Sequence, residues 1–417
     1  MTAGRLVAIG FIYLCTTVAW FVLGGTVVAR TGEQDGELRG EVTRLWGGEH
    51  VQAAPDAWWE ERREVARQVE ETDAQGNRAL RTVLETVVDR RPVPFVRTRA
   101  KVSLALDYRR KGLLWYDTYA VRFAGDWVVK NSDSAPREIL VHFAFPSREG
   151  IYDGFRFRVA GQDAPPADDL SAGVTARVIL PPGGEAPVEV RYRSRGLDSW
   201  TYSLGAGVSH VRDFELVLDT DFDRIDFPAG SISPHRKIAR GDGQRLVWRF
   251  ETLVTGQKVA VDLPGRLEPG PLAARISFFA PVSLLFFVTI LVIQGVLRRR
   301  SLHPMNYFFL SAAFFSFHLL LAYLVDHVDV HVAFAAASTV SVVLVVSYLR
   351  LVSGMRFAVL EAGAAQVLFL VLFGWAFFFE GYTGLTITAG AIVTLFVLMQ
   401  LTGRVDWSRA FSKERAE

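Results

Sequence analysis

The stretch ISFFAPVSLLFFVTILVIQGVLRRR, residues 276–300, decides the fold: a long apolar run is followed directly by three arginines. Comparable apolar runs, six in all, cover residues 6–29, 276–297, 305–325, 332–349, 357–379 and 385–401. Each has about 17 to 24 residues, enough for a helix to cross a hydrocarbon core of about 30 Å. Residues 30–271 are too polar to do so. We predict an α-helical membrane bundle of six spans, arranged one plus five, with a large exported domain between the first and second spans.

The distribution of basic residues predicts the orientation. Residues 326–331 and 380–384 contain no Lys or Arg, whereas the opposite turns and the tail carry Arg298, Arg299, Arg300, Arg350, Arg356, Arg404, Arg409, Lys413 and Arg415. Basic residues concentrate in cytoplasmic loops. We therefore expect a multi-pass protein of the bacterial inner membrane, with cytoplasmic termini and residues of about 30–271 in the periplasm.

The first span can also be interpreted as a cleaved signal peptide. Its apolar run is longer than the apolar region of a signal peptide, and only Arg5 supplies an N-terminal charge, so we favour an uncleaved anchor over residues 1–29. The single cysteine, Cys15, lies in this span, so the exported domain has no disulfide. A net charge of +2 gives no indication of nucleic-acid binding, and the lipid bilayer is the partner that the composition predicts.

The exported part divides by pattern. Residues 30–95 form a charged segment that we expect to be helical, with Asp56 as an N-cap and Trp58, Val65 and Val69 on one stripe. Residues 96–271 alternate apolar and polar residues between Gly- and Pro-rich turns, which predicts a mainly-β, sandwich-like domain of antiparallel strands. The five-helix bundle then covers 272–403, and 404–417 form a cytoplasmic tail.

Two groups of polar residues are candidate sites. Asp326, His327, Asp329 and His331 could converge on zinc or nickel, but a six-residue turn between membrane helices must be polar in any case, so we favour no metal. His318 lies within the third span, and we expect it to hydrogen-bond to Ser338 or Ser341. Common hydrolase and nucleotide-binding motifs are missing from the sequence, so we predict neither catalytic residues nor a cofactor.

Several short strings resemble the CreD family of bacterial inner-membrane proteins. They are Leu45-Trp46-Gly47-Gly48, His303-Pro304-x-x-Tyr307, Asp326-His327 and Val405-Asp406-Trp407. Residues 274–281 depart from the family pattern, which indicates a divergent branch. The resemblance implies a cell-envelope integrity protein, linked to colicin tolerance and cell-wall stress, without enzymatic activity.

Three hypotheses follow. The leading one is a non-enzymatic envelope protein whose exported β-domain binds an envelope protein or a cell-wall component. The second is a membrane carrier for a lipid or small molecule that uses the polar residues within the spans. The third is a membrane metallohydrolase built on residues 326–331. Carriers commonly contain internal repeats among their spans, and none is evident in this sequence.

Overall fold

The computed structural model describes residues 3–72, 78–112, 114–166, 169–205, 209–297, 302–379 and 381–403. Two compact units divide the chain. The helical unit comprises residues 1–38, 110–115 and 267–417, and the β-rich unit comprises residues 39–109 and 116–266.

The predicted spans are confirmed. Six helices in the described part of the chain are long and apolar enough to cross a membrane. They are α1 (Ala3–Trp46), α2 (Pro269–Leu297), α3 (Pro304–Leu324), α4 (Val330–Ser353), a fifth span from Met355 to Phe378 and α8 (Thr383–Thr402). The fifth span is built from α5 (Met355–Phe357), η1 (Ala358–Gly363), α6 (Ala364–Gln366), η2 (Val367–Leu372), α7 (Phe373–Trp375) and η3 (Ala376–Phe378). Of these, η1 and η2 are π-helical.

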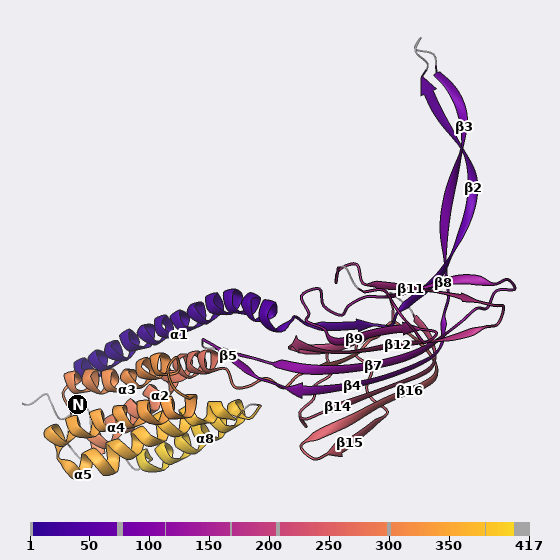
Figure 1. The fold of residues 1–417 in the computed structure, drawn as a ribbon. Coiled ribbons are helices and arrows are strands. Elements are labelled where there is room, and N and C mark those ends of the chain that lie inside the picture. The colour runs from indigo at the N-terminus through magenta and orange to yellow at the C-terminus, as the bar shows by residue number, and fades with distance from the viewer. Residues whose placement is uncertain are drawn as a thin grey trace, which may run out of the picture. The chain divides into compact units, whose positions relative to one another are not determined.

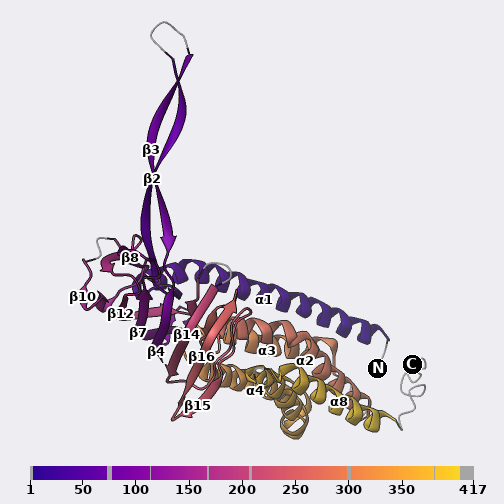
Figure 2. The same ribbon diagram turned by 90° about the vertical axis from the view of Figure 1, so that its right-hand side faces the viewer.

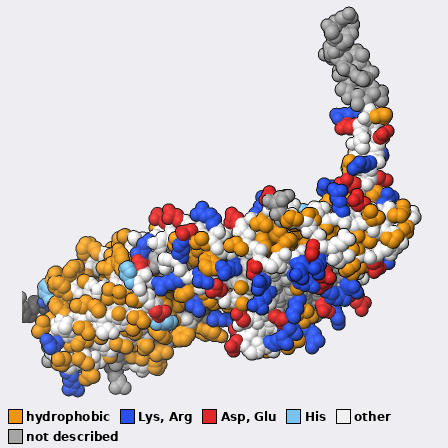
Figure 3. Space-filling model, in the orientation of Figure 1, with side chains coloured by type: hydrophobic (Ala, Val, Ile, Leu, Met, Phe, Trp, Pro, Cys, Tyr) orange, Lys and Arg blue, Asp and Glu red, His pale blue; other side chains and the backbone are white. Residues whose placement is uncertain are grey.

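Large apolar side chains fill the inside of the helical unit. Phe287, Phe314 and Phe317 are fully buried there. The visible face of the helices is also covered largely by hydrophobic side chains, whereas Lys, Arg, Asp and Glu gather over the β-rich unit (Figure 3). Apolar residues both inside and outside are the pattern of helices that face lipid.

The β-rich unit consists mainly of strands (Figure 1). An eight-stranded sheet has the order β10-β9-β12-β7-β4-β14-β16-β15. Its strands are β4 (Phe95–Leu106), β7 (Thr118–Lys130), β9 (Asp153–Val159), β10 (Gln162–Asp163), β12 (Glu185–Leu197), β14 (Ser209–Thr220), β15 (Arg236–Arg240) and β16 (Gly243–Thr255). A three-stranded sheet contains β1 (His50–Ala53), β13 (Ser199–Ser203) and β17 (Val259–Asp262). A four-stranded sheet contains β11 (Val174–Leu180), β8 (Arg137–Phe143), β2 (Asp56–Thr72) and β3 (Arg78–Pro92).

The predicted mainly-β domain is confirmed, but two strand pairs differ from the antiparallel expectation. Strand β14 runs parallel to β4, and β1 runs parallel to β13. Parallel neighbours are joined by long connections, and local turn signals therefore do not reveal them. One apolar core, which includes the fully buried Trp127, Trp200 and Trp248, receives side chains from all three sheets. The sandwich arrangement itself stays a prediction.

The helix predicted to begin at Asp56 is wrong, because Asp56–Thr72 and Arg78–Pro92 are the strands of an antiparallel hairpin. In a strand Trp58 and Val65, seven residues apart, lie on opposite faces, so the apolar stripe assumed for a helix does not exist. Within the described part of the chain, only Asp56–Trp58 of this hairpin pair with a third strand, β8. Beyond them the hairpin, called here the ribbon, projects as two strands from the neighbourhood of β8 in both views (Figures 1 and 2).

Candidate functional site

One end of the helical unit gathers charged residues around the family string Asp326-His327. Arg30 of α1 donates to both carboxylate oxygens of Asp326, at 3.0 and 3.4 Å, and to the carbonyl oxygen of Ala322, at 2.8 Å. The side chains of Arg30 and Asp326 are only 28% and 26% exposed. Hydrogen bonds between ionised groups are strong when partly removed from water. This contact therefore fixes the first span against the end of the third.

A hairpin from the middle of the chain meets the same helix end. It consists of β5 (Arg109–Lys111) and β6 (Leu114–Tyr116). Arg110 donates to the carbonyl oxygen of Val325 at 2.9 Å, and the backbone N–H of Trp115 donates to the Glu268 carboxylate at 3.1 and 3.3 Å. Residues 110–115 accordingly fold with the helices. We call Arg30, Asp326, Arg110, Trp115 and Glu268 the hairpin clamp.

The other residues of the predicted histidine cluster have separate partners. Asp329 accepts from the backbone N–H of His331 at 2.8 Å and so caps α4. The His331 ring lies against Phe378 and Trp375, with centroids 4.9 and 5.8 Å away. The backbone N–H of His327 donates to the carbonyl oxygen of Leu324. Within the described residues, no three His, Cys, Asp or Glu side chains are grouped as metal ligands would be.

His318 is buried, but its partner differs from the one predicted. Its Nδ1 lies 3.2 Å from the carbonyl oxygen of Phe314, and its ring lies 5.4 Å from that of Trp20 in α1. Ser341 instead accepts from Gln366 at 2.8 Å and donates to the carbonyl oxygen of Ala313 at 2.6 Å. A backbone carbonyl one turn away satisfies an imidazole without any movement of a neighbouring helix, which explains the difference. These polar groups join helices of the bundle.

The string His303-Pro304-x-x-Tyr307 begins α3. The Nδ1 atom of His303 accepts from the N–H of Met305 at 3.2 Å, and Pro304 occupies the first turn, where it sacrifices no hydrogen bond. Tyr307 is buried. The motif residues Asp406 and Trp407 lie outside the described part of the chain.

The string Leu45-Trp46-Gly47-Gly48 lies at the end of α1 and contacts strand β12 of the β-rich unit. Gly47 has φ +97°, and an added Cβ would lie 2.6 Å from the carbonyl oxygen of Arg195. Only glycine fits such a helix end. Two guanidinium groups lie against the Trp46 ring, those of Arg109 at 4.2 Å and Arg195 at 4.6 Å from its centroid. The motif therefore attaches the start of the β-rich unit to β12.

Behind this motif lies a buried polar cluster. His50 is fully buried, and its Nε2 lies 3.1 Å from the hydroxyl of Ser194, while the Tyr119 hydroxyl lies 3.5 Å from its Nδ1. Burial lowers the pKa of His50 to about 4, so the ring is neutral at pH 7. Ser194 is also buried, and its contact with His50 joins β1 to β12.

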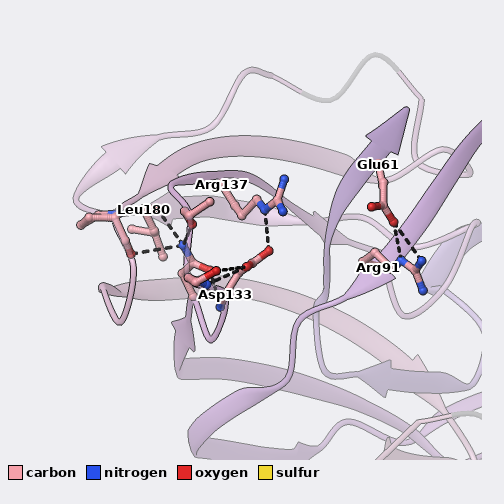
Figure 4. Close-up of polar contacts among 9 residues, drawn as sticks. Glu61, Arg91, Asp133, Arg137 and Leu180 are labelled. Atoms are coloured by element: carbon pink, nitrogen blue, oxygen red, sulfur yellow. Dashed lines mark hydrogen bonds and ion pairs between the residues drawn. The ribbon is translucent and has the colours of Figure 1, made fainter. Parts of the chain in front are cut away.

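Aromatic and charged groups fix the root of the ribbon. The Arg137 guanidinium lies 3.8 Å from the ring centroid of Trp59, and that of Arg90 lies 4.8 Å from Trp58. Figure 4 shows the ion pair between Arg91 and Glu61 across the two strands, at 2.9 Å, and Arg137 directed toward Asp133. Beyond the root, Leu84 and Val88 are exposed.

Sequence reasoning identified Asp326 and Trp46 but missed their partners. Arg30 falls at the start of the predicted exported part, and the ribbon falls in the segment that the sequence predicts to be helical. One signal lies in the sequence: Arg30 directly follows an apolar run, and charged residues within membrane spans usually pair with other polar groups.

Residues 257–408 match the family described as inner membrane protein CreD, which confirms the resemblance over that part of the chain. No curated protein matches the chain. A crystal structure from Legionella pneumophila, described as a candidate nutrient binding protein, is similar at 10% identity and TM-score 0.31, over 47% of this chain and 72% of that one. A substrate-bound M1 zinc metallopeptidase mutant from Deinococcus radiodurans is similar at 10% identity and TM-score 0.24, over 76% and 92%. Both scores are too low to bear on function.

Proposed function

We propose that this inner-membrane protein is non-enzymatic and supports the integrity of the cell envelope. Its β-rich unit faces the periplasm, both termini face the cytoplasm, and the ribbon binds an envelope protein or cell-wall component. The arginine-rich turns between spans favour this orientation. The family match over residues 257–408 supports the envelope role.

The ribbon is the observation that carries the proposal. A third strand accompanies it only at Asp56–Trp58, and its two strands then continue to Thr72 and from Arg78. A two-stranded hairpin without a packed face is only marginally stable in water. Cross-strand ion pairs, Arg63–Asp89 and Arg67–Glu85, both at 3.4 Å, contribute little because they are exposed. A partner that covers the ribbon would supply the missing apolar burial.

The hairpin clamp supports a role in which the exported part is held by the membrane helices. Arg110 and Trp115 belong to the stretch between β4 and β7, yet they bond to Val325 and Glu268 of the helical unit.

Photocrosslinking in intact cells tests the ribbon. A photoreactive phenylalanine analogue replaces exposed Leu84 or Val88 in the ribbon, and exposed Ile179 of β11 or Ile238 of β15 as matched controls. We expect a discrete crosslinked product from the ribbon positions and none from the controls. Replacement of residues 60–90 by a short Gly-Ser turn should keep the protein in the membrane but abolish both the product and resistance to envelope stress. Equal crosslinking at all four positions would contradict the proposal.

A further inference from the structure

A second surface of the β-rich unit gathers three arginines around a hollow. Arg193 and Arg195 are exposed on β12, while Ser194 and Gly196 between and beside them are buried, so the two arginines share the outer face of the sheet. Arg122 of β7 is exposed on the same face, because it lies directly opposite Arg193 in the register. The small Ala120 lies opposite Arg195.

The space between these side chains is a hollow of about 350 Å³. Its lining includes Ala120, Arg122, Ile151, Asp153, Arg193 and Arg195. Ala120 leaves the room that a larger side chain would fill. Exposed Ile151 adds an apolar wall.

The charges in the hollow are not balanced. Asp153 pairs with Arg193 at 2.7 Å. Among the described residues, no ion pair joins Arg122 to a carboxylate, although it faces the like charge of Arg193 directly across the strand pair. Like charges directly opposite each other destabilise a sheet. Three guanidinium groups and one carboxylate leave two positive charges facing the hollow.

One of the arginines is already held in place. The ion pair between Asp153 and Arg193 is exposed and contributes little, whereas the Trp46 ring supports Arg195 at 4.6 Å from its centroid. A cation–π contact positions a guanidinium without neutralising it. Guanidinium groups bind phosphate oxygens through paired, parallel hydrogen bonds. Side chains held in advance lose little conformational entropy when a ligand binds.

We propose that this hollow binds a phosphate ester, with the phosphate between Arg122, Arg193 and Arg195 and the organic part against Ala120 and Ile151. The same chemistry is presented by a soluble sugar or glycerol phosphate and by a phospholipid headgroup. The site does not depend on the partner of the ribbon, which lies on other strands.

Calorimetric titration of the full-length protein, purified in a maltoside detergent at low salt, tests the site. Glycerol 1-phosphate is the soluble probe, dihexanoyl phosphatidylglycerol is the headgroup probe, and succinate is the carboxylate control. Saturable binding of glycerol 1-phosphate indicates a soluble phosphate ester, and binding of the lipid alone indicates a headgroup. Failure of both, or equal binding of succinate, would overturn the proposal.

Variants locate the binding. We expect Arg122→Gln to weaken binding at least about tenfold, since it removes a charge-assisted pair of hydrogen bonds, and Arg195→Gln to act likewise. The matched control is Arg156→Gln, which changes an exposed arginine on β9 outside the hollow and should leave affinity unchanged. Arg122→Gln also removes the like charge opposite Arg193, so its melting temperature should not fall, which excludes unfolding as the cause. Wild-type affinity in Arg122→Gln would overturn the proposal.

Discussion

Arg30 in the first span and Asp326, two residues after the end of the third span, form a bidentate ion pair, with nitrogen–oxygen distances of 3.0 and 3.4 Å. The Tyr323 ring lies 5.4 Å from the same guanidinium. This relationship gives the acidic residue of the string Asp326-His327 a physical role: it connects two spans that are far apart in the sequence.

Loss of either charge should loosen that connection. We expect Arg30→Gln and Asp326→Asn each to lower the free energy of unfolding by about 1–3 kcal/mol, because each leaves a partly buried ionised group without its partner. The measurement is thermal unfolding of the detergent-solubilised protein, followed by tryptophan fluorescence. The double variant should be no less stable than the worse single variant, and strictly additive losses would contradict a direct interaction.

Two groups in the β-rich unit should give opposite dependences of stability on pH. Burial lowers the pKa of His50 to about 4, so the unfolded state takes up more protons and stability falls as the pH falls from about 6.5 to 4. Burial, together with the nearby Asp198, raises the pKa of Asp117 to about 6, so stability from this group rises as the pH falls through the same range. The two trends oppose each other in the wild type.

Substitution should separate these trends. Between pH 6.5 and 4.5, the change in melting temperature of His50→Gln should be more favourable than that of the wild type, and that of Asp117→Asn should be less favourable. The measurement is the melting temperature of the full-length protein at a series of pH values. If both variants follow the wild-type profile, the assigned pKa directions are wrong.

Gly47 should tolerate no side chain. Its positive φ and the 2.6 Å approach of an added Cβ to the Arg195 carbonyl oxygen predict that Gly47→Ala destabilises the protein by about 1–3 kcal/mol. The matched control is Gly36→Ala in exposed α1, where a Cβ meets nothing within 4 Å. Alanine there should stabilise the helix by about 0.5–1 kcal/mol. Equal melting temperatures of the two variants would show that the α1 end is not constrained as described.

Metal removal should not affect the protein. Asp326, Asp329 and His331 already have partners in Arg30, the α4 N-terminus and the rings of Trp375 and Phe378. Elemental analysis of the purified protein should therefore find no stoichiometric zinc or nickel, and a chelator should leave its melting temperature unchanged. About one tightly held ion per chain, lost in His327→Gln/His331→Gln, would contradict this assignment.

The spans could be predicted because a membrane requires a long, continuous apolar run. Most strands of the β-rich unit could be predicted because burial of one face imposes an alternation of apolar and polar residues. The ribbon could not be predicted from the sequence. Its charges lie on both faces, so no apolar alternation marks it, and the pairs Arg63–Asp89 and Arg67–Glu85 exist only across two strands. The pattern Trp58, Val65, Val69 imitates a helix stripe by chance.

The candidate sites were predictable only in part. Short strings such as Trp46-Gly47 and Asp326-His327 pointed to positions through the family resemblance. Their partners Arg195 and Arg30 lie far away in the sequence, and a single sequence contains no signal that connects them. The arginine hollow was equally invisible, because it depends on the register that sets Arg122 opposite Arg193.

The side of the membrane on which the ribbon lies tests the account most directly. In a Cys15→Ala background, single cysteines replace exposed Leu84 in the ribbon and exposed Met355 at the start of the fifth span. Intact cells are treated with a membrane-impermeant maleimide that passes the outer membrane. We predict that Leu84→Cys is labelled in intact cells and Met355→Cys only after the inner membrane is permeabilised. Labelling of Met355→Cys but not of Leu84→Cys in intact cells would contradict the account.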